Sequence, residues 1–224
     1  MGKRKNKLSK EEQAEVEEWI YQNNTEETRM TDTMTIRVKC KTENQKILVN
    51  AIKEKEVVIC SGPAGTGKTF LACAEALKLI KRNGKYKKIV IVKSVTTLKN
   101  EEIGFLKGNL REKMEPFMFS FVHNFEKIVG QSITSRLREL KTIEELPIAY
   151  MRGINLDRSI IIIDEAQNIS QENIRTIMTR LGKDSKMIFL GDERQQDSKG
   201  GNGLTFLMDH FTDIEEIGCV QFTK

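Results

Sequence analysis

The feature that most constrains this chain is a glycine-rich loop with the pattern G-x-x-x-x-G-K-T. The loop consists of Gly62, Pro63, Ala64, Gly65, Thr66, Gly67, Lys68 and Thr69. It lies between a strand-like apolar run, residues 57–60, and a helix-like run, residues 70–74. Glycines let backbone N–H groups turn toward a phosphate, and the following helix presents the positive end of its dipole. In this context the pattern predicts a nucleoside triphosphate site rather than a chance match.

Two side chains of this loop have specific expected roles. Lys68 is expected to contact the outer phosphates and to take part in catalysis, and the Thr69 hydroxyl is expected to hold Mg²⁺. The other loop residues, Gly62 to Gly67, are expected to bind the nucleotide through their backbone.

A second motif, an apolar run that ends in two carboxylates, predicts hydrolysis. Residues 160–163 are all isoleucine, which is typical of a buried strand in a parallel sheet, and Asp164 and Glu165 follow them. Ligands of open α/β sheets lie beyond the carboxyl ends of the strands. We therefore expect Asp164 to hold Mg²⁺ through water and Glu165 to orient and polarise the attacking water. The alternative is a solvated acidic turn, which the phosphate loop upstream makes less favoured.

A third apolar run, residues 186–190, is followed by polar residues 191–195. Gln195 is a candidate for orienting the water or sensing the γ-phosphate, and Asp192 is a candidate for supporting the Mg²⁺ shell. The alternative is an ordinary turn in which the aspartate caps the backbone.

The order of these runs predicts an α/β fold. Strands alternate with helices along the chain, which implies a parallel sheet with helices on both faces. The expected strands are 57–61, 88–92, 160–163 and 186–190, with an edge strand at 36–40 and another strand at 147–150. The expected helices are 46–53, 69–82 and 171–182, and residues 100–146 read as a long, mostly helical insertion.

The length of 224 residues allows one sizeable domain with appendages. We expect a P-loop ATPase domain at 36–224, preceded at 1–35 by a basic tail, a short helix and a linker. The net charge is +5, and five basic residues without an acid lie within residues 1–10. This tail either contacts phosphate backbones or is simply solvated, and the second interpretation is favoured.

The sequence also argues against a membrane-spanning protein and against a secreted one. The chain has no apolar stretch near the ~18 residues that span a bilayer, and no secretory signal follows Met1. Its four cysteines, Cys40, Cys60, Cys73 and Cys219, are too widely spaced for a metal motif. They favour a reducing, cytoplasmic setting. The lack of a long apolar stretch predicts that the chain has no membrane partner.

Several linked motifs together resemble the PhoH-like family of ATPases over about residues 40–222. The family's fold is similar to the RecA-like N-terminal domain of superfamily 1 helicases. The motifs are the phosphate loop, residues 103–110 (IGFLKGNL), residues 149–153 (AYMRG), residues 164–168 (DEAQN), and Gly191-Asp192 with Gln195.

This resemblance implies that the protein binds ATP and Mg²⁺ and couples ATP hydrolysis to handling of single-stranded RNA or DNA. It also implies a homo-oligomer, with a hexameric ring as one form. Gln45 would bond the adenine edge, because an amide can both donate and accept. The alternative for this segment is a plain helix N-terminus capped by Thr42. Arg152 would face phosphate, nucleic acid or a neighbouring subunit.

The sequence departs from the family pattern in two places. An Arg-Pro pair is usual after the second core strand, whereas this chain has Lys93, Ser94 and Val95. Family members also continue past their last strand with an arginine-bearing segment, and the sequence here ends at Lys224. Arg180, Arg194 or Lys93 would then substitute, or the sequence is part of a longer chain. The second function that remains open is a nucleotide-dependent switch or assembly module with little hydrolysis.

Overall fold

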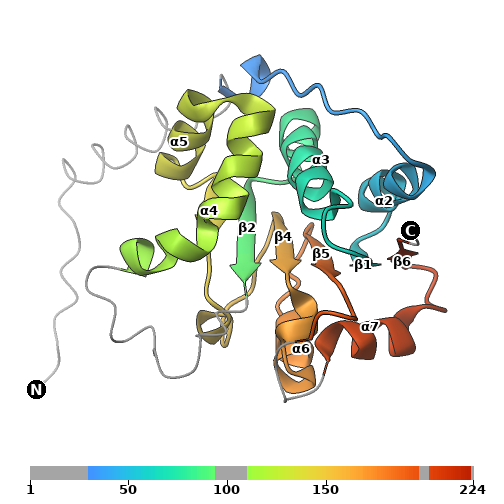
Figure 1. Ribbon diagram of the computed structural model, residues 1–224. Coiled ribbons are helices and arrows are strands. Elements are labelled where there is room, and N and C mark those ends of the chain that lie inside the picture. The colour runs from blue at the N-terminus through green and yellow to red at the C-terminus, as the bar shows by residue number, and fades with distance from the viewer. Residues whose placement is uncertain (1–29, 94–109, 197–201, 223–224) are drawn as a thin grey trace, which may run out of the picture.

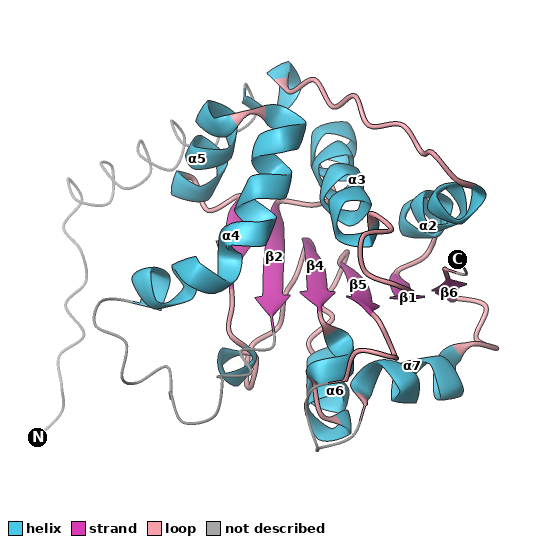
Figure 2. Cartoon of the chain, viewed as in Figure 1, coloured by secondary structure: helices cyan, strands magenta, loops and turns pink. Residues whose placement is uncertain are grey.

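The computed structural model describes residues 30–93, 110–196 and 202–222, and it contains one sheet of six parallel strands (Figures 1 and 2). The strand order is β3-β2-β4-β5-β1-β6. The strands are β1 (Val57–Ser61), β2 (Lys88–Lys93), β3 (Ile143–Glu145), β4 (Ser159–Asp164), β5 (Lys186–Gly191) and β6 (Ile217–Gln221). Every neighbouring pair runs parallel, so all the carboxyl ends meet at one edge.

Helices cover both faces of this sheet (Figure 2). One face carries α2 (Glu43–Glu54), α3 (Lys68–Asn83), α4 (Leu110–Val129) and α5 (Gln131–Glu139). The other carries α6 (Gln171–Met178) and α7 (Gly203–Phe211). Two 3₁₀ turns, η2 (Ile148–Tyr150) and η3 (Ala166–Asn168), connect elements near the carboxyl edge. The predicted α/β class with a parallel sheet is confirmed.

The run of four isoleucines in β4 is explained by burial on both faces. Ile160 and Ile162 pack into the core under α2 to α5, whereas Ile161 and Ile163 pack into the core under α6 and α7. All four are fully buried. A strand covered on both sides needs apolar residues at every position, so the usual alternation disappears.

Strand β5 lies between β1 and β4, which is the RecA-like arrangement. Its register pairs Gly191 with Ser61 of β1, and Phe189 with Ile163 of β4. The phosphate loop after β1, the carboxylates after β4 and the polar turn after β5 therefore emerge side by side. This order positions all three predicted motifs at one site.

Two predicted strands are wrong. Residues 36–40 form no ladder with any described strand, although Ile36, Val38 and Cys40 pack against the core, so their alternation reflects one buried face without strand pairing. Residues 148–150 form η2, whose N-cap is Pro147, and the edge strand is instead β3. Proline has no N–H for a ladder, which favours a turn here.

Some element boundaries also differ from the prediction. The helix expected over 171–182 ends at Met178, because residues 179–182 turn back to pair with the loop before β4. Residues 30–33 are helical, although the sequence predicts a linker there. The prediction did not identify α7 and β6. The expected tail and most of the linker, residues 1–29, lie outside the described residues.

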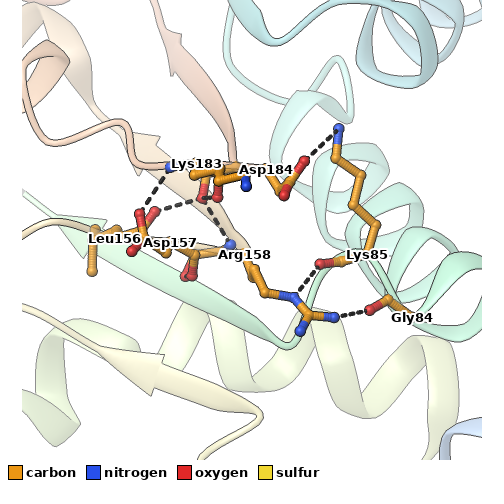
Figure 3. Close-up of polar contacts among 9 residues, drawn as sticks. Gly84, Lys85, Leu156, Asp157, Arg158, Lys183 and Asp184 are labelled. Carbon is orange, nitrogen blue, oxygen red and sulfur yellow. Dashed lines mark hydrogen bonds and ion pairs between the residues drawn. The ribbon is translucent and has the colours of Figure 1, made fainter.

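The edge opposite the carboxyl ends is cross-linked by polar contacts between the loops that precede β2, β4 and β5 (Figure 3). The Arg158 amide donates to the Lys183 carbonyl at 2.9 Å, and the Lys183 amide donates to Asp157 Oδ1 at 2.8 Å. The Arg158 guanidinium donates to the carbonyls of Lys85, at 3.0 Å, and of Gly84. These bonds fix the relative positions of the three loops.

A methyl group at Gly182 should destabilise this edge. A Cβ atom there would lie 2.1 Å from Asp157 Oδ1 and 2.7 Å from the Leu156 carbonyl carbon and oxygen. Because backbone cannot move aside cheaply, we expect Gly182→Ala to lower the free energy of unfolding by roughly 1–3 kcal/mol in urea titrations. Gly84→Ala is the control: Gly84 is in the left-handed α conformation (φ 55°, ψ −3°) with open space around it, so only backbone strain of about 1 kcal/mol applies. Equal losses for both variants would contradict the steric explanation.

Lys186, at the start of β5, is a buried cation that should make stability depend on pH. Its side chain is almost fully buried, and burial, together with nearby Lys85, lowers its pKa from 10.5 to about 8. The unfolded chain therefore binds this proton more tightly, so stability rises as pH increases from about 8 to 10.5. We expect Lys186→Met to raise the free energy of unfolding at pH 7 by roughly 1–3 kcal/mol.

That gain should disappear above about pH 10.5, where the lysine is neutral in both states. The exposed Lys183→Met removes a charge from the same edge and should change stability by less than about 0.5 kcal/mol. Denaturant unfolding from about pH 6 to about pH 11 measures the free energy of unfolding of both variants. A gain that does not change with pH, or a loss at pH 7, would show that burial of the charge is not the cause.

None of the helices within the described ranges is both long and apolar enough to cross a lipid bilayer.

Candidate nucleotide-binding site

The phosphate loop wraps the N-terminus of α3 in the conformation that its glycines predict. Gly65 (φ 77°) and Gly67 (φ 86°) are left-handed, and Gly67 is the N-cap of α3. A Cβ atom at Gly65 would meet nothing within 4 Å, so the loop faces open space there. Gly62 donates its N–H to the Gly191 carbonyl at 3.1 Å and is closely covered by Phe222. The loop is thus supported from below and open toward a ligand.

Lys68 is buried and folded over the loop. Its ammonium donates to the carbonyls of Gly62 at 2.6 Å and of Pro63 at 2.9 Å. These carbonyls keep the charge in place at the centre of the loop. Phosphate oxygens are stronger acceptors for an ammonium than neutral carbonyls, so the arrangement fits an anion that draws Lys68 outward.

The two predicted metal ligands lie together. The Thr69 hydroxyl, in α3, lies 3.3 Å from both carboxylate oxygens of Asp164, the last residue of β4. Burial raises the pKa of Asp164 to about 6, and the neighbouring charge of Glu165 adds to the shift. A buried carboxylate beside a hydroxyl is a hard oxygen donor pair, which fits Mg²⁺ taking its other ligands from water and phosphate. No cluster of three or more metal-binding side chains occurs within the described ranges.

Glu165 follows directly, in a left-handed conformation (φ 55°) that is unusual for a residue other than glycine. Its carboxylate accepts a 2.6 Å hydrogen bond from Gln167 Nε2. Gln167 is almost fully buried, and its Oε1 accepts from the Asp192 amide at 3.2 Å. The strained backbone and this bond aim Glu165 at the cleft.

Gln167 therefore links Glu165 to the turn after β5, and the sequence interpretation missed it. Its Nε2 also donates to the Gln195 carbonyl at 3.3 Å. Its Oε1 would be only 2.3 Å from a Cβ at position 191, which explains the glycine there. The only signal in the sequence was its place in the DEAQN segment, which does not show what the side chain contacts.

The turn after β5 fits both interpretations of its residues, as an ordinary capped turn and as part of the site. Asp192 Oδ1 accepts from the Arg194 amide at 3.0 Å, so the aspartate does cap a turn. Asp192 and Gln195 nevertheless both line the cleft with Asp164 and Glu165. Their candidate roles remain predictions.

The loop opens into a cleft of about 810 Å³. Its lining contains most of the predicted site residues: Gln45, Ala64, Gly65, Thr66, Gly67, Lys68, Thr69, Asp164, Glu165 and Gln195. Gly62 and Pro63 support the loop through Lys68. The cleft is also lined by Val38, Lys39, Lys41, Phe70, Asn124 and Lys127, which the sequence interpretation did not identify. Asn124 and Lys127 come from α4, within the predicted helical insertion.

Gln45 reaches the loop, but its amide is engaged at both ends. Nε2 donates to the Thr66 carbonyl at 2.9 Å, and Oε1 accepts from the Lys41 amide at 2.6 Å. Thr42 caps α2 by accepting from the Gln45 amide. The helix-cap alternative for this segment is thus realised, and the adenine role of Gln45 stays a prediction.

The basic residues considered as sources of positive charge for the transition state lie in different places. Arg180 bonds Thr176, Thr179 and Ile154, lies by the loops of the opposite edge, and does not line the cleft of its own chain. Arg194 belongs to the turn that carries Gln195. Arg152 is exposed, 3.8 Å from Glu172, and does not line the cleft. Residues 94–99 and most of the IGFLKGNL segment lie outside the described residues.

The order of the strands, the conformation of the loop and the carboxylates after β4 define a P-loop NTPase domain. Comparison with known proteins gives the family. A family model described as "PhoH-like protein" matches residues 37–224. A PhoH-like protein of Bacillus subtilis (strain 168) is 37% identical over 220 residues, which is 97% of this chain and 67% of that protein. The chain belongs to the PhoH-like family.

Other relatives are longer than this chain. The PhoH protein of Escherichia coli (strain K12) is 31% identical over 194 residues, 85% of this chain and 54% of that protein. A PhoH-like protein of Synechocystis sp. is 38% identical over 160 residues, 71% of this chain and 48% of that protein. The chain thus spans from about half to two thirds of these relatives.

The matches among solved structures include distant helicases and terminases. The UvsW helicase of bacteriophage T4 matches with a TM-score of 0.47 and 11% identity, over 90% of this chain and 67% of that one. The large terminase of a thermophilic bacteriophage, in complex with ADP, matches with a TM-score of 0.42 and 10% identity, over 81% of this chain and 45% of that one. At these scores the likeness carries no information about function.

Proposed function

We propose that this protein is a Mg²⁺-dependent ATPase whose hydrolysis is coupled to handling of RNA or DNA. The observation that carries the proposal is the meeting of Thr69 and Asp164 at 3.3 Å, with Glu165 next to them, beside the phosphate loop. A purely structural acidic turn would not need to bring a P-loop hydroxyl to a buried carboxylate.

Each residue has a role that follows from its position. Lys68 and the backbone amides of the loop would bind the outer phosphates, and Thr69 and Asp164 would hold Mg²⁺. Bound Mg²⁺ supplies positive charge that offsets the charge of the phosphate oxygens. Glu165, held by Gln167, would take the position of the base that orients the attacking water, with Gln195 at the same end of the cleft.

The hydrogen bonds of Gln167 suggest how Glu165 and the turn after β5 would move together. It bonds Glu165 and the turn that carries Asp192 and Gln195, so a shift of that turn would change the aim of the carboxylate. Coupling to a polymer requires that kind of connection between the γ-phosphate and a distant contact. The nucleic-acid part of the proposal is supported by the family resemblance.

The test is release of phosphate from Mg-ATP by the purified chain, alone and with single-stranded RNA or DNA. The proposal expects Mg²⁺-dependent turnover that EDTA abolishes and that one of the two polymers stimulates. ATP binding without turnover under every condition would contradict the ATPase. Turnover that neither polymer changes would contradict the coupling.

A switch or assembly module with little hydrolysis is the second candidate, and one observation favours it. None of the described residues that line the cleft is an arginine. An arginine supplied to the transition state is worth about 10³–10⁵ in rate, so a site that works without one would turn over slowly. A nucleotide-dependent change in sedimentation of the chain, without phosphate release, would support this candidate.

A further inference from the structure

The β3 end of the sheet carries an apolar groove on the face where α6 and α7 lie. In the described structure α7 packs against β1, β5 and β6, and α6 packs against α7 (Figure 2). The groove lies beyond them, is lined by the connection 146–156, and has a volume of about 470 Å³. None of the described residues of α6 or α7 lines it. Its floor is apolar and consists of Val90, Ile143, Leu146, Ile154 and Leu156.

Strand β3, beside the groove, is also an edge of the sheet. It has three residues, and its one neighbour within the described ranges is β2. Proteins cover such edges with a helix or a loop, or protect them with charge, because an open edge can pair with another chain. Two ion pairs, Lys88 with Glu144 at 2.7 Å and Arg138 with Glu145 at 2.9 Å, protect the rim here. The apolar floor has no comparable charge.

A segment of this chain has the pattern that such a groove fits. Residues 9–20, which lie outside the described residues, read SKEEQAEVEEWI and begin with a capping box, so the sequence predicts a short helix. Val16, Trp19 and Ile20 have the spacing of one apolar stripe on that helix. Five glutamates and no basic residue lie within residues 11–18. The pattern is that of an acidic amphipathic helix with one narrow apolar side.

The rim of the groove and the surface next to it carry the opposite charge. Residues 81–88 (KRNGKYKK) contain five basic residues and no acid, and the last of them, Lys88, lines the groove. The exposed Lys141 lines it as well. Glu139, on the same rim, is paired with Arg136 at 2.8 Å. Opposite charges on two surfaces favour their contact and fix its orientation.

The adjoining loops add to this positive charge. Lys85, Arg158 and Lys183 gather there with two aspartates, Asp157 and Asp184 (Figure 3). The Arg158 guanidinium donates to two backbone carbonyls, which are neutral and do not offset its charge. An acidic helix in the groove would therefore face basic side chains both on the rim and on these loops.

The chain is long enough for the contact to be intramolecular. The described part starts beside Lys81, whose ammonium donates to the carbonyls of Asp32 and Met34 at 2.9 and 2.7 Å. Residues 81–88 run from that point to the groove and span at most about 25 Å, and residues 21–29 can span about 30 Å. A short tether gives an effective concentration on the order of 1 mM, so that even a weak contact is populated.

We propose that residues 9–20 dock in the groove beside β3, with Val16, Trp19 and Ile20 on the apolar floor and the glutamates facing the basic rim. The occupant is the chain's own segment rather than that of a second copy. Docked there, the segment covers the edge of the sheet and keeps β3 from pairing with another chain. The inference does not depend on the nucleotide site.

The test uses Trp19, which is the single tryptophan of the chain. In the full chain its emission should lie at shorter wavelength than in urea, with weaker quenching by acrylamide, because an indole in the groove is shielded from water. Ile154→Asp places a charge on the floor and should move the emission toward the value in urea. Ile214→Asp is the matched control, since Ile214 is a partly exposed isoleucine before β6, at the other end of the sheet. It should leave the emission unchanged.

A charge exchange tests the same contact without altering the floor of the groove. Lys87→Glu together with Lys141→Glu changes two exposed side chains and should also move the emission toward the value in urea. Adding Glu17→Lys and Glu18→Lys to that variant should restore the wild-type emission, because the two surfaces again have opposite charge. Thermal melting followed by circular dichroism shows whether each variant is folded.

Three results would overturn the proposal. The first is a wild-type emission equal to that of the chain in urea, which would mean that Trp19 is not shielded. The second is an emission that neither Ile154→Asp nor the double lysine variant changes, which would place the segment elsewhere. The third is a shift that disappears on about a hundredfold dilution, which would show that a second copy takes part in the contact.

Discussion

Replacement of Lys68 by alanine is expected to weaken binding of Mg-ATP by at least about 100-fold, because the ammonium supplies charge-assisted bonds to the outer phosphates. In the structure this ammonium is held at the centre of the loop by the Gly62 and Pro63 carbonyls. Alanine removes the ammonium together with its bonds to these two carbonyls, so the variant loses both the charge and one support of the loop. Calorimetric titration of the variant with Mg-ATP measures the effect.

Lys53→Ala is a suitable control for this experiment, since it removes an exposed lysine from the last turn of α2, away from the cleft. That variant should bind Mg-ATP like the wild type. Thermal melting should show that Lys68→Ala is still folded. A folded Lys68→Ala protein that retains wild-type affinity would show that the loop does not bind the phosphates.

Replacement of Glu165 by glutamine is expected to reduce the rate of ATP hydrolysis by about 10²–10⁴-fold while leaving ATP bound. Glutamine has the same shape and keeps an oxygen that can accept from Gln167, so the 2.6 Å contact and the fold should survive. What it loses is the basicity needed to polarise water. Single-turnover measurements with bound ATP separate this effect from any change in affinity.

Glu172→Gln is the matched control, because Glu172 is an exposed carboxylate on α6 with a long ion pair to Arg152. It should leave both binding and turnover unchanged. Hydrolysis at the wild-type rate by Glu165→Gln would rule out Glu165 as the base. Loss of ATP binding in that variant would point instead to a role in the metal site.

The sequence predicts the central sheet well because the buried strands are long, apolar runs with a distinctive composition. The expected bounds of β1, β2, β4 and β5 agree with the observed bounds to within a residue or so. The edges of the fold are harder to predict. Residues 36–40 alternate like a strand but pair with no described strand, and β3 is only three residues long. At these places tertiary packing, rather than local pattern, determines the conformation.

Prediction of the site is limited in a similar way. Motifs identify residues that lie near the phosphate loop or at strand ends, and Lys68, Thr69, Asp164 and Glu165 do meet in one cleft. Contacts that depend on how a distant helix packs have no signature in the sequence. Asn124 lies within a helical insertion, and only the packing of α4 beside α3 brings it to the cleft. The bonds of Gln167 likewise depend on the order of β4 and β5 in the sheet.

The most direct test of the central claim is a crystal structure of the chain with Mg²⁺ and a non-hydrolysable ATP analogue. The account predicts the phosphates within the loop from Gly62 to Thr69, contacted by Lys68, and a metal ion beside Thr69 and Asp164. It also predicts Glu165 facing the γ-phosphate across one water molecule. A nucleotide bound elsewhere, or a loop that stays closed around Lys68 at saturating ligand, would contradict it.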